Sequence, residues 1–79
     1  MLDCRVKRII DIALIMNKGK YKTNEVIIRR INNYNYNEHT TITHNDIHIK
    51  ISTETNIKGV ENVLYLYPDG ESELTFEFN

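Results

Sequence analysis

Apolar residues in the first part of the chain recur at helical spacing. The first predicted helix runs from about Asp3 to Lys18, with Asp3 as its N-cap and Gly19 able to end it in a left-handed conformation. Its apolar stripe consists of Val6, Ile9, Ile10, Ala13 and Met16. Ile12 and Ile15 fall outside this stripe, so the helix is apolar nearly all round. Such a helix is expected to be buried on two sides or to face a partner.

A second helix is predicted from Asn24 to Tyr34. Thr23 is a favourable N-cap, and Glu25 in the first turn suits the helix dipole. Its apolar face consists of Ile27, Ile31 and Tyr34, flanked by Val26 and Ile28. Arg29 and Arg30 lie on the outer side. The asparagine-rich stretch 32–37 then ends the helix, because asparagine side chains compete for the backbone.

The remaining pattern is typical of β-strands. Thr40–His44 and Ile47–Ser52 are rich in β-branched residues, and isoleucines alternate with polar residues in the second run. A two-residue turn at Asn45-Asp46 is expected to join them, which places Ile42 beside Ile49 on one apolar face.

A final hairpin is predicted to join Val63–Tyr67 to Glu73–Phe78 through Pro68-Asp69-Gly70, a favourable turn sequence. Leu74, Phe76 and Phe78 point to one side of their strand. In the preceding strand, Leu64 and Leu66 alternate with Val63, Tyr65 and Tyr67. Both faces of that strand are therefore apolar or aromatic, which predicts a central strand.

These elements predict one α+β domain over residues 1–79, with two N-terminal helices packed on a four-stranded antiparallel sheet in the order ααββββ. The alternative is a winged helix, in which Thr43–Asn56 forms a third helix and the last hairpin is the wing. Isoleucines at two-residue spacing and the Ser-Thr-Glu-Thr run are poor material for that third helix.

Length and composition narrow the function classes. A chain of 79 residues buries only about 60–65% of its unfolded surface, so a partner chain is a natural source of further stability. Cys4 is the only cysteine, which excludes an internal disulfide and suits a cytoplasmic location. No apolar run approaches the roughly 18 residues of a membrane span. Frequent isoleucine, asparagine, lysine and tyrosine indicate an A/T-rich genome, as in many phages, viruses and mobile elements.

Charge is segregated along the chain. Residues 1–39 hold eight basic and four acidic residues, a balance of +4, whereas residues 40–79 hold two basic and seven acidic residues, a balance of −5. The basic set with tyrosines nearby is a candidate for nucleic-acid contact: Lys18, Lys20, Lys22, Arg29 and Arg30. The acidic set can keep the last hairpin soluble or can face a basic partner protein.

No residue pattern points to catalysis. His44 and His48 are suitably spaced for a metal only if their segment is helical, and in a hairpin they point to opposite faces. Cys4 beside Arg5 has no evident histidine base. Phosphate-binding glycine loops, Cys-x-x-Cys pairs and hydrolase motifs are absent from the sequence. We therefore expect no enzyme activity, no metal and no cofactor.

The leading hypothesis is a small non-enzymatic protein-binding protein, for example a phage, viral or mobile-element accessory protein that inhibits a host or defence protein by contact. Its candidate contact residues are Ile12, Ile15, Tyr65, Tyr67, Glu71, Glu73 and Glu77. The alternatives are a winged-helix DNA-binding regulator that uses the basic set, and a structural subunit of a larger assembly. A homo-oligomer is compatible with each of the three.

Overall fold

The computed structural model describes residues 4–16 and 25–78, and these form two helices and four strands. The elements follow in the order α1 (Cys4–Met16), α2 (Glu25–Asn33), β1 (Thr40–His44), β2 (Ile49–Glu54), β3 (Val60–Leu66) and β4 (Ser72–Phe78). The α+β class and the four-stranded antiparallel sheet are confirmed. The second helix differs from the prediction at its end, since α2 ends at Asn33 and not at Tyr34, and the predicted start at Asn24 lies outside the described residues. The predicted caps Asp3, Gly19 and Thr23 lie outside the described residues.

The winged-helix alternative is wrong. The segment Thr43–Asn56, which would have been its third helix, contains the end of β1, a turn and all of β2. Ile49 and Ile51 are fully buried while Lys50 between them is only half-buried, so the alternation follows the two faces of a sheet.

The strands follow one another in space in the order β1-β2-β3-β4, so β3 is central as predicted. The first hairpin differs in register: Ile42 pairs with Ile51, and not with Ile49 as expected. The connection is longer than two residues, because the side chain of Asn45 accepts hydrogen bonds from the N–H groups of Ile47 (2.7 Å) and His48 (3.0 Å). Ile47 therefore lies outside β2 and is 68% exposed.

The last hairpin turns as its sequence predicts. Gly70 has a φ of 92° and donates its N–H to the carbonyl of Tyr67 at 3.0 Å. The N–H of Tyr67 donates to the carbonyl of Glu71 at 2.9 Å, which opens the ladder between β3 and β4. Glycine is favoured at a position with a left-handed conformation, because glycine has no Cβ to clash with the backbone. β3 begins at Val60, three residues before the predicted start at Val63.

The core lies between the two helices and one face of β2 and β3. It contains Val6, Ile9, Ala13, Ile27, Ile31, Tyr34, Ile49, Ile51, Leu64 and Leu66. The hydroxyl of Tyr34 lies 2.6 Å from the carbonyl of Asn62 and 3.2 Å from that of Ile51, so it fastens the end of α2 to the middle of the sheet. Burial is the main cause that raises the pKa of this hydroxyl above its ordinary value of 10.0.

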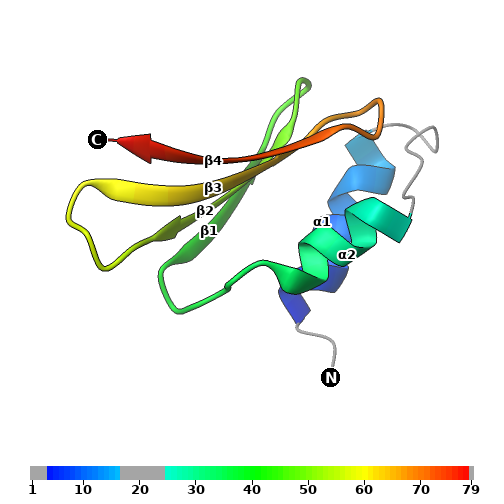
Figure 1. The fold of residues 1–79 in the computed structure, drawn as a ribbon. Helices are drawn as coiled ribbons and strands as arrows, with labels where there is room; N and C mark the ends of the chain where they lie inside the picture. The colour runs from blue at the N-terminus through cyan, green and yellow to red at the C-terminus, as the bar shows by residue number, and fades with distance from the viewer. Residues whose placement is uncertain (1–3, 17–24, 79) are drawn as a thin grey trace.

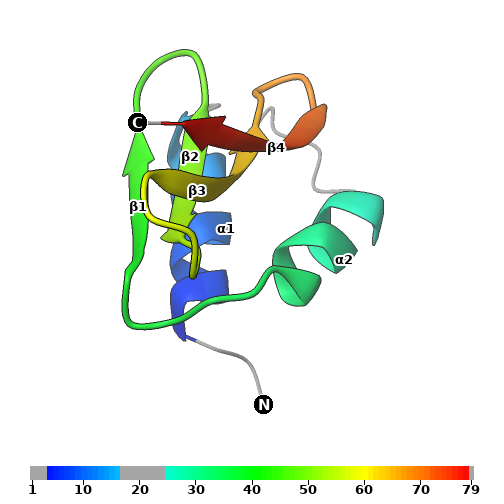
Figure 2. The same cartoon turned by 60° about the vertical axis from the view of Figure 1, so that its left-hand side comes forward.

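The helices cover only one end of the sheet. They lie beneath the end that carries the turn between β3 and β4, and the other end, with the C-terminus of β4, extends beyond them (Figure 1). A second view shows α1 behind β2 and β3, with α2 standing off to the side of β4 (Figure 2). Within residues 4–16 and 25–78, no helix is long and apolar enough to cross a membrane.

Candidate functional site: the two faces and the free edge of β4

Three large apolar side chains of β4 face the helix side of the sheet without being covered. The register pairs Leu74 with Leu64, Phe76 with Asn62 and Phe78 with Val60. Leu64 is in the core, so this is the face that the sequence predicts to be apolar. Leu74, Phe76 and Phe78 are nevertheless 62%, 61% and 79% exposed. We call these three side chains the β4 strip.

A hollow adjoins the β4 strip where α2 diverges from the sheet. Its volume is about 440 Å³. Its walls include Arg30, Asn33 and Tyr34 on the helix side and Asn62, Leu64 and Leu74 on the sheet side. The walls thus combine apolar side chains with amides and one guanidinium group, a composition typical of a site for another chain.

The free edge of the sheet runs along the same strand, because β4 is last in the strand order. The hydrogen bond between Tyr67 and Glu71 makes these two residues a hydrogen-bonded pair of the β3–β4 ladder. In an antiparallel ladder, hydrogen-bonded and non-hydrogen-bonded pairs alternate along the strands. Residues 73, 75 and 77 therefore turn their main-chain groups toward β3. Leu74, Phe76 and Phe78 turn theirs toward the free edge. In the described residues, the carbonyl of Phe76 receives only a long contact of 3.5 Å from Thr75 Oγ1.

Arg30 holds α2 against the first residue of β4. Its Nη1 donates to the Ser72 hydroxyl at 2.6 Å and to the Ser72 carbonyl at 3.3 Å. The free edge available to another strand therefore begins after Ser72. The neighbouring Arg29 is exposed on α2.

The opposite, open face of the sheet carries an aromatic and charged cluster. The rings of Tyr65 and Tyr67 are nearly parallel with centroids 6.3 Å apart, and the ring of His48 meets Tyr65 edge-on at 4.9 Å. The ammonium group of Lys50 lies 5.9 Å from the Tyr65 ring centroid, within reach of a cation–π interaction. The Tyr67 hydroxyl donates to Glu73 at 3.1 Å.

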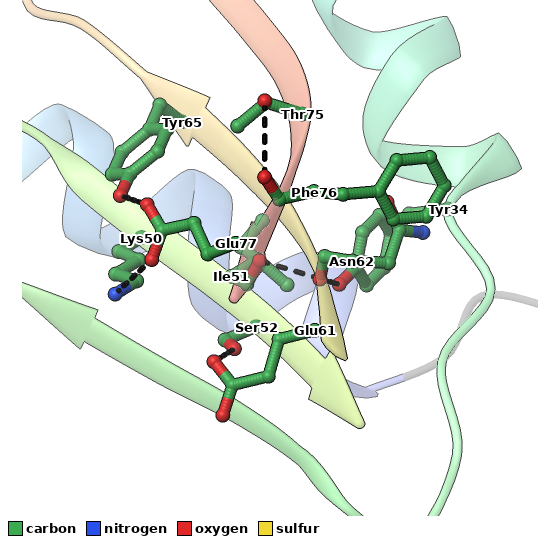
Figure 3. A network of polar contacts seen from close by, with 10 residues as sticks. All are labelled: Tyr34, Lys50, Ile51, Ser52, Glu61, Asn62, Tyr65, Thr75, Phe76 and Glu77. Carbon is green, nitrogen blue, oxygen red and sulfur yellow. Dashed lines mark hydrogen bonds and ion pairs between the residues drawn. The ribbon is translucent and has the colours of Figure 1, made fainter. Parts of the chain in front are cut away.

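Glu77 joins this cluster from β4. Its carboxylate accepts from the Tyr65 hydroxyl and pairs with Lys50 Nζ at 3.0 Å, as Figure 3 shows. The hydrogen bond from Tyr65 is the main cause that holds the pKa of Glu77 below its ordinary value of 4.5, and Lys50 adds to it. The same contacts with Glu77 raise the pKa of both Lys50 and Tyr65. The ionic form of the pair is therefore the favoured one near neutral pH.

The structure brings together four of the residues predicted from sequence to contact a partner: Tyr65, Tyr67, Glu73 and Glu77 lie on the open face. Glu71 is exposed in the adjoining turn. Ile12 is half-buried and packs against the core, whereas Ile15 is 79% exposed on α1. Leu64 and Leu66 pack in the core with α1, and the tyrosines alternate with them along the strand. The tyrosines therefore lie on the other side of the sheet from α1, and the two groups form separate surfaces.

The candidate nucleic-acid residues are only partly placed. Lys18, Lys20 and Lys22 lie outside the described residues. Of the two remaining arginines, Arg29 is exposed and Arg30 contacts Ser72. The structure thus shows Arg30 in a contact within the fold.

The histidines and the cysteine are dispersed. His48 contacts Tyr65 on the open face, His44 pairs with Ile49 at the end of β1, and His39 lies 3.6 Å from Glu38 in the preceding turn. Cys4 is exposed at the start of α1. Among the residues that the structure describes, no group of three or more His, Cys, Asp or Glu side chains is arranged to hold a metal ion.

The β4 strip was missed as a site by sequence reasoning, which assigned Leu74, Phe76 and Phe78 to an apolar face of the sheet. The available signal was their density, since three large apolar residues alternate along the last strand. An exposed edge strand of this length normally carries few apolar side chains, or is covered by a helix or loop. No protein-family model matches this chain, and comparison with curated proteins and with solved structures likewise gave no match.

Proposed function

We propose that this chain is a non-enzymatic protein-binding protein and that the β4 strip is its principal contact surface. The observation that carries the proposal is the exposure of Leu74, Phe76 and Phe78 on one face of one edge strand. Contiguous exposed apolar side chains on a small domain are typical of binding sites. Aromatic side chains also make strong contacts, since they bury a large area with few rotatable bonds.

The surroundings of the β4 strip favour a specific contact over non-specific aggregation. Glu73 and Glu77 alternate with the apolar side chains and place negative charge on the other face of the same strand. Charged residues on an edge strand disfavour uncontrolled pairing. The adjoining hollow, with amide groups of Asn33 and Asn62 in its walls, adds polar positions that can select a partner.

The role that we propose for this contact is inhibition of a host or defence protein by an accessory protein of a phage, virus or mobile element. The support is compositional: isoleucine, asparagine, lysine and tyrosine, whose codons are rich in A and T, are frequent, and the 79 residues carry no catalytic motif. A structural subunit of a larger assembly uses the same surface in a different way, because its partner is bound permanently. The lifetime of the complex separates the two roles.

The proposal is tested with a double variant, Phe76→Ser with Phe78→Ser. The matched control is Ile47→Ser with Ile57→Ser, which removes two apolar side chains that are similarly exposed but lie in turns. Proteins captured by each chain from nuclease-treated lysate of a bacterial host with an A/T-rich genome are compared by quantitative mass spectrometry, and the recovered partner is purified for calorimetry. We expect the strip variant to lose about tenfold or more in affinity and the control to bind as the wild type. Equal binding by all three chains overturns the proposal.

A further inference from the structure

We propose that the partner binds by strand addition, and that it contributes an extended segment in which apolar and basic residues alternate. The segment pairs with the free edge of β4 along residues 74–78. The inference rests on the proposed function, since it specifies how the β4 strip is covered. It also names the chemistry of the partner, which the exposure of the strip alone does not.

The main chain of β4 provides the hydrogen-bonding partners. Leu74, Phe76 and Phe78 point their N–H and C=O groups to the free edge, as the phase set by the Tyr67–Glu71 bond requires. An added strand satisfies these groups with its own main chain, which gives affinity without any sequence requirement. Arg30 already occupies the carbonyl of Ser72, so it marks where the added strand has to end.

The side chains of an added strand alternate between two different environments. On the helix side they meet the β4 strip and the hollow beside Leu74, which favours apolar residues. On the open face they meet Glu73 and Glu77, with Glu71 in the adjoining turn. Lys50 neutralises part of this charge at Glu77, and Glu73 is hydrogen-bonded only to the neutral Tyr67 hydroxyl in the described residues. Basic residues are therefore favoured at every second position of the partner.

A second copy of this chain fits the edge less well. Two β4 strands related by a two-fold axis pair antiparallel. Their apolar side chains lie on the same side of the joined sheet only if one residue pairs with itself in the other copy. A register centred on Thr75 sets Glu73 opposite Glu77 of the other copy. A register centred on Phe76 makes the two Glu77 residues diagonal neighbours. Both bring like charges of the two copies together, which destabilises cross-strand pairing.

The first experiment uses a capped octapeptide of alternating valine and lysine, titrated into the full chain labelled with ¹⁵N. We expect saturable shifts along β4 and slower hydrogen exchange at the amides of Leu74, Phe76 and Phe78. The matched peptide with glutamate in place of lysine is expected to bind about tenfold more weakly or not at all. The variant Glu73→Gln is expected to weaken binding of the lysine peptide by about two- to fivefold. Equal binding of the two peptides overturns the charge requirement.

The second experiment removes one edge donor and leaves every side chain in place. The chain is short enough for chemical synthesis, so Phe76 can be installed with an N-methylated backbone. Its N–H points away from β3, and the fold is expected to be retained, as circular dichroism and the β3 amide signals will show. Binding of the lysine peptide is expected to fall by more than about tenfold. Unchanged binding overturns strand addition.

The outcomes separate this inference from the proposed function. If N-methylation leaves partner binding intact but Phe76→Ser with Phe78→Ser abolishes it, the β4 strip is the binding site and strand addition is wrong. If neither change matters, both are wrong. Sedimentation of the free chain tests whether a second copy of the chain occupies the edge. A dimer that dissociates on N-methylation at Phe76 and does not bind the peptide would identify the second copy as the occupant. That result overturns the proposal of an alternating apolar and basic segment.

Discussion

The ammonium group of Lys50 in β2 lies 3.0 Å from the carboxylate of Glu77 in β4, so this ion pair spans the central strand between them. Lys50 is registered with Tyr65 of β3 and Glu77 with Glu61. Val63 lies midway between these two positions on the same face. The register therefore places the ion pair across the position of Val63, a valine on the open face whose exposed fraction is 0%.

Acid is expected to weaken the protein through Glu77. The folded state holds the pKa of this carboxyl below 4.5, so its contribution is fully present above that value and is lost as the pH falls through the lowered pKa. Glu77→Gln removes the contribution at every pH. We therefore expect the urea midpoints of wild type and variant to differ near about pH 7 and to converge only as the pH falls through the lowered pKa of Glu77, in a titration followed by circular dichroism.

Glu71→Gln is the control for that titration, because it removes one charge from the same hairpin at an exposed position of the turn. Its urea midpoint should remain close to that of the wild type. A constant difference between wild type and Glu77→Gln across the acid range would contradict the assignment to Glu77. In base, the raised pKa values of Tyr65 and Lys50 place the corresponding loss above pH 10.0 and 10.5.

Tyr34→Phe is expected to destabilise the fold by about 1–2 kcal/mol, because it leaves the carbonyl of Asn62 without the donor that lies 2.6 Å away. The ring remains, so cavity formation does not contribute. Tyr67→Phe removes an exposed hydroxyl that bonds to Glu73, and we expect no measurable loss from it. Urea denaturation measures both, and equal stability of the two variants would show that the Tyr34 hydroxyl does not hold α2 to the sheet.

The register of the first hairpin is tested by two isoleucines in one alternating run. Ile51→Ala should cost about 2–4 kcal/mol because the side chain is fully buried, whereas Ile47→Ala should stay within about 0.5 kcal/mol because it is 68% exposed. Ile51→Val, with an expected loss of about 0.5–1.5 kcal/mol, keeps the test readable if the alanine variant does not fold. Comparable losses at both positions would indicate the two-residue turn and its register.

Arg30→Ala is expected to lower stability by about 0.5–1 kcal/mol through loss of the contacts with Ser72. Arg29→Ala is a closely matched control, since it removes an identical side chain from the adjacent position, where it is exposed. Urea denaturation gives both values. Hydrogen exchange in β4 should also accelerate near Ser72 only in Arg30→Ala, and acceleration in both variants would indicate a general effect of charge.

Much of the fold follows from the sequence because period and turn chemistry are local properties. The isoleucines at 49 and 51 alternate with polar residues, and their burial matches that alternation. Pro68-Asp69-Gly70 forms the turn that its sequence favours, with Gly70 left-handed. The mixed faces of Val63–Tyr67 correctly predict the central position of β3. Each of these inferences depends on a few adjacent residues.

The register of the first hairpin was not predictable in the same way. Pairing Ile42 with Ile51 instead of Ile49 is a shift of two residues, and a shift of two leaves every side chain on its original face. The apolar pattern is identical for both registers. The choice between them falls to the turn, where Asn45 binds the N–H groups of Ile47 and His48.

By itself, the sequence determined which residues of β4 share a face, since a strand alternates with a period of two residues. Only the tertiary structure decided that Leu74, Phe76 and Phe78 stay exposed on that face, because coverage depends on where the helices lie over the sheet. The same holds for Val63, which is fully buried on the open face at the position that an ion pair between two other strands crosses. The face to which a side chain points is set within its own strand, whereas the burial of that face depends on elements distant in the chain.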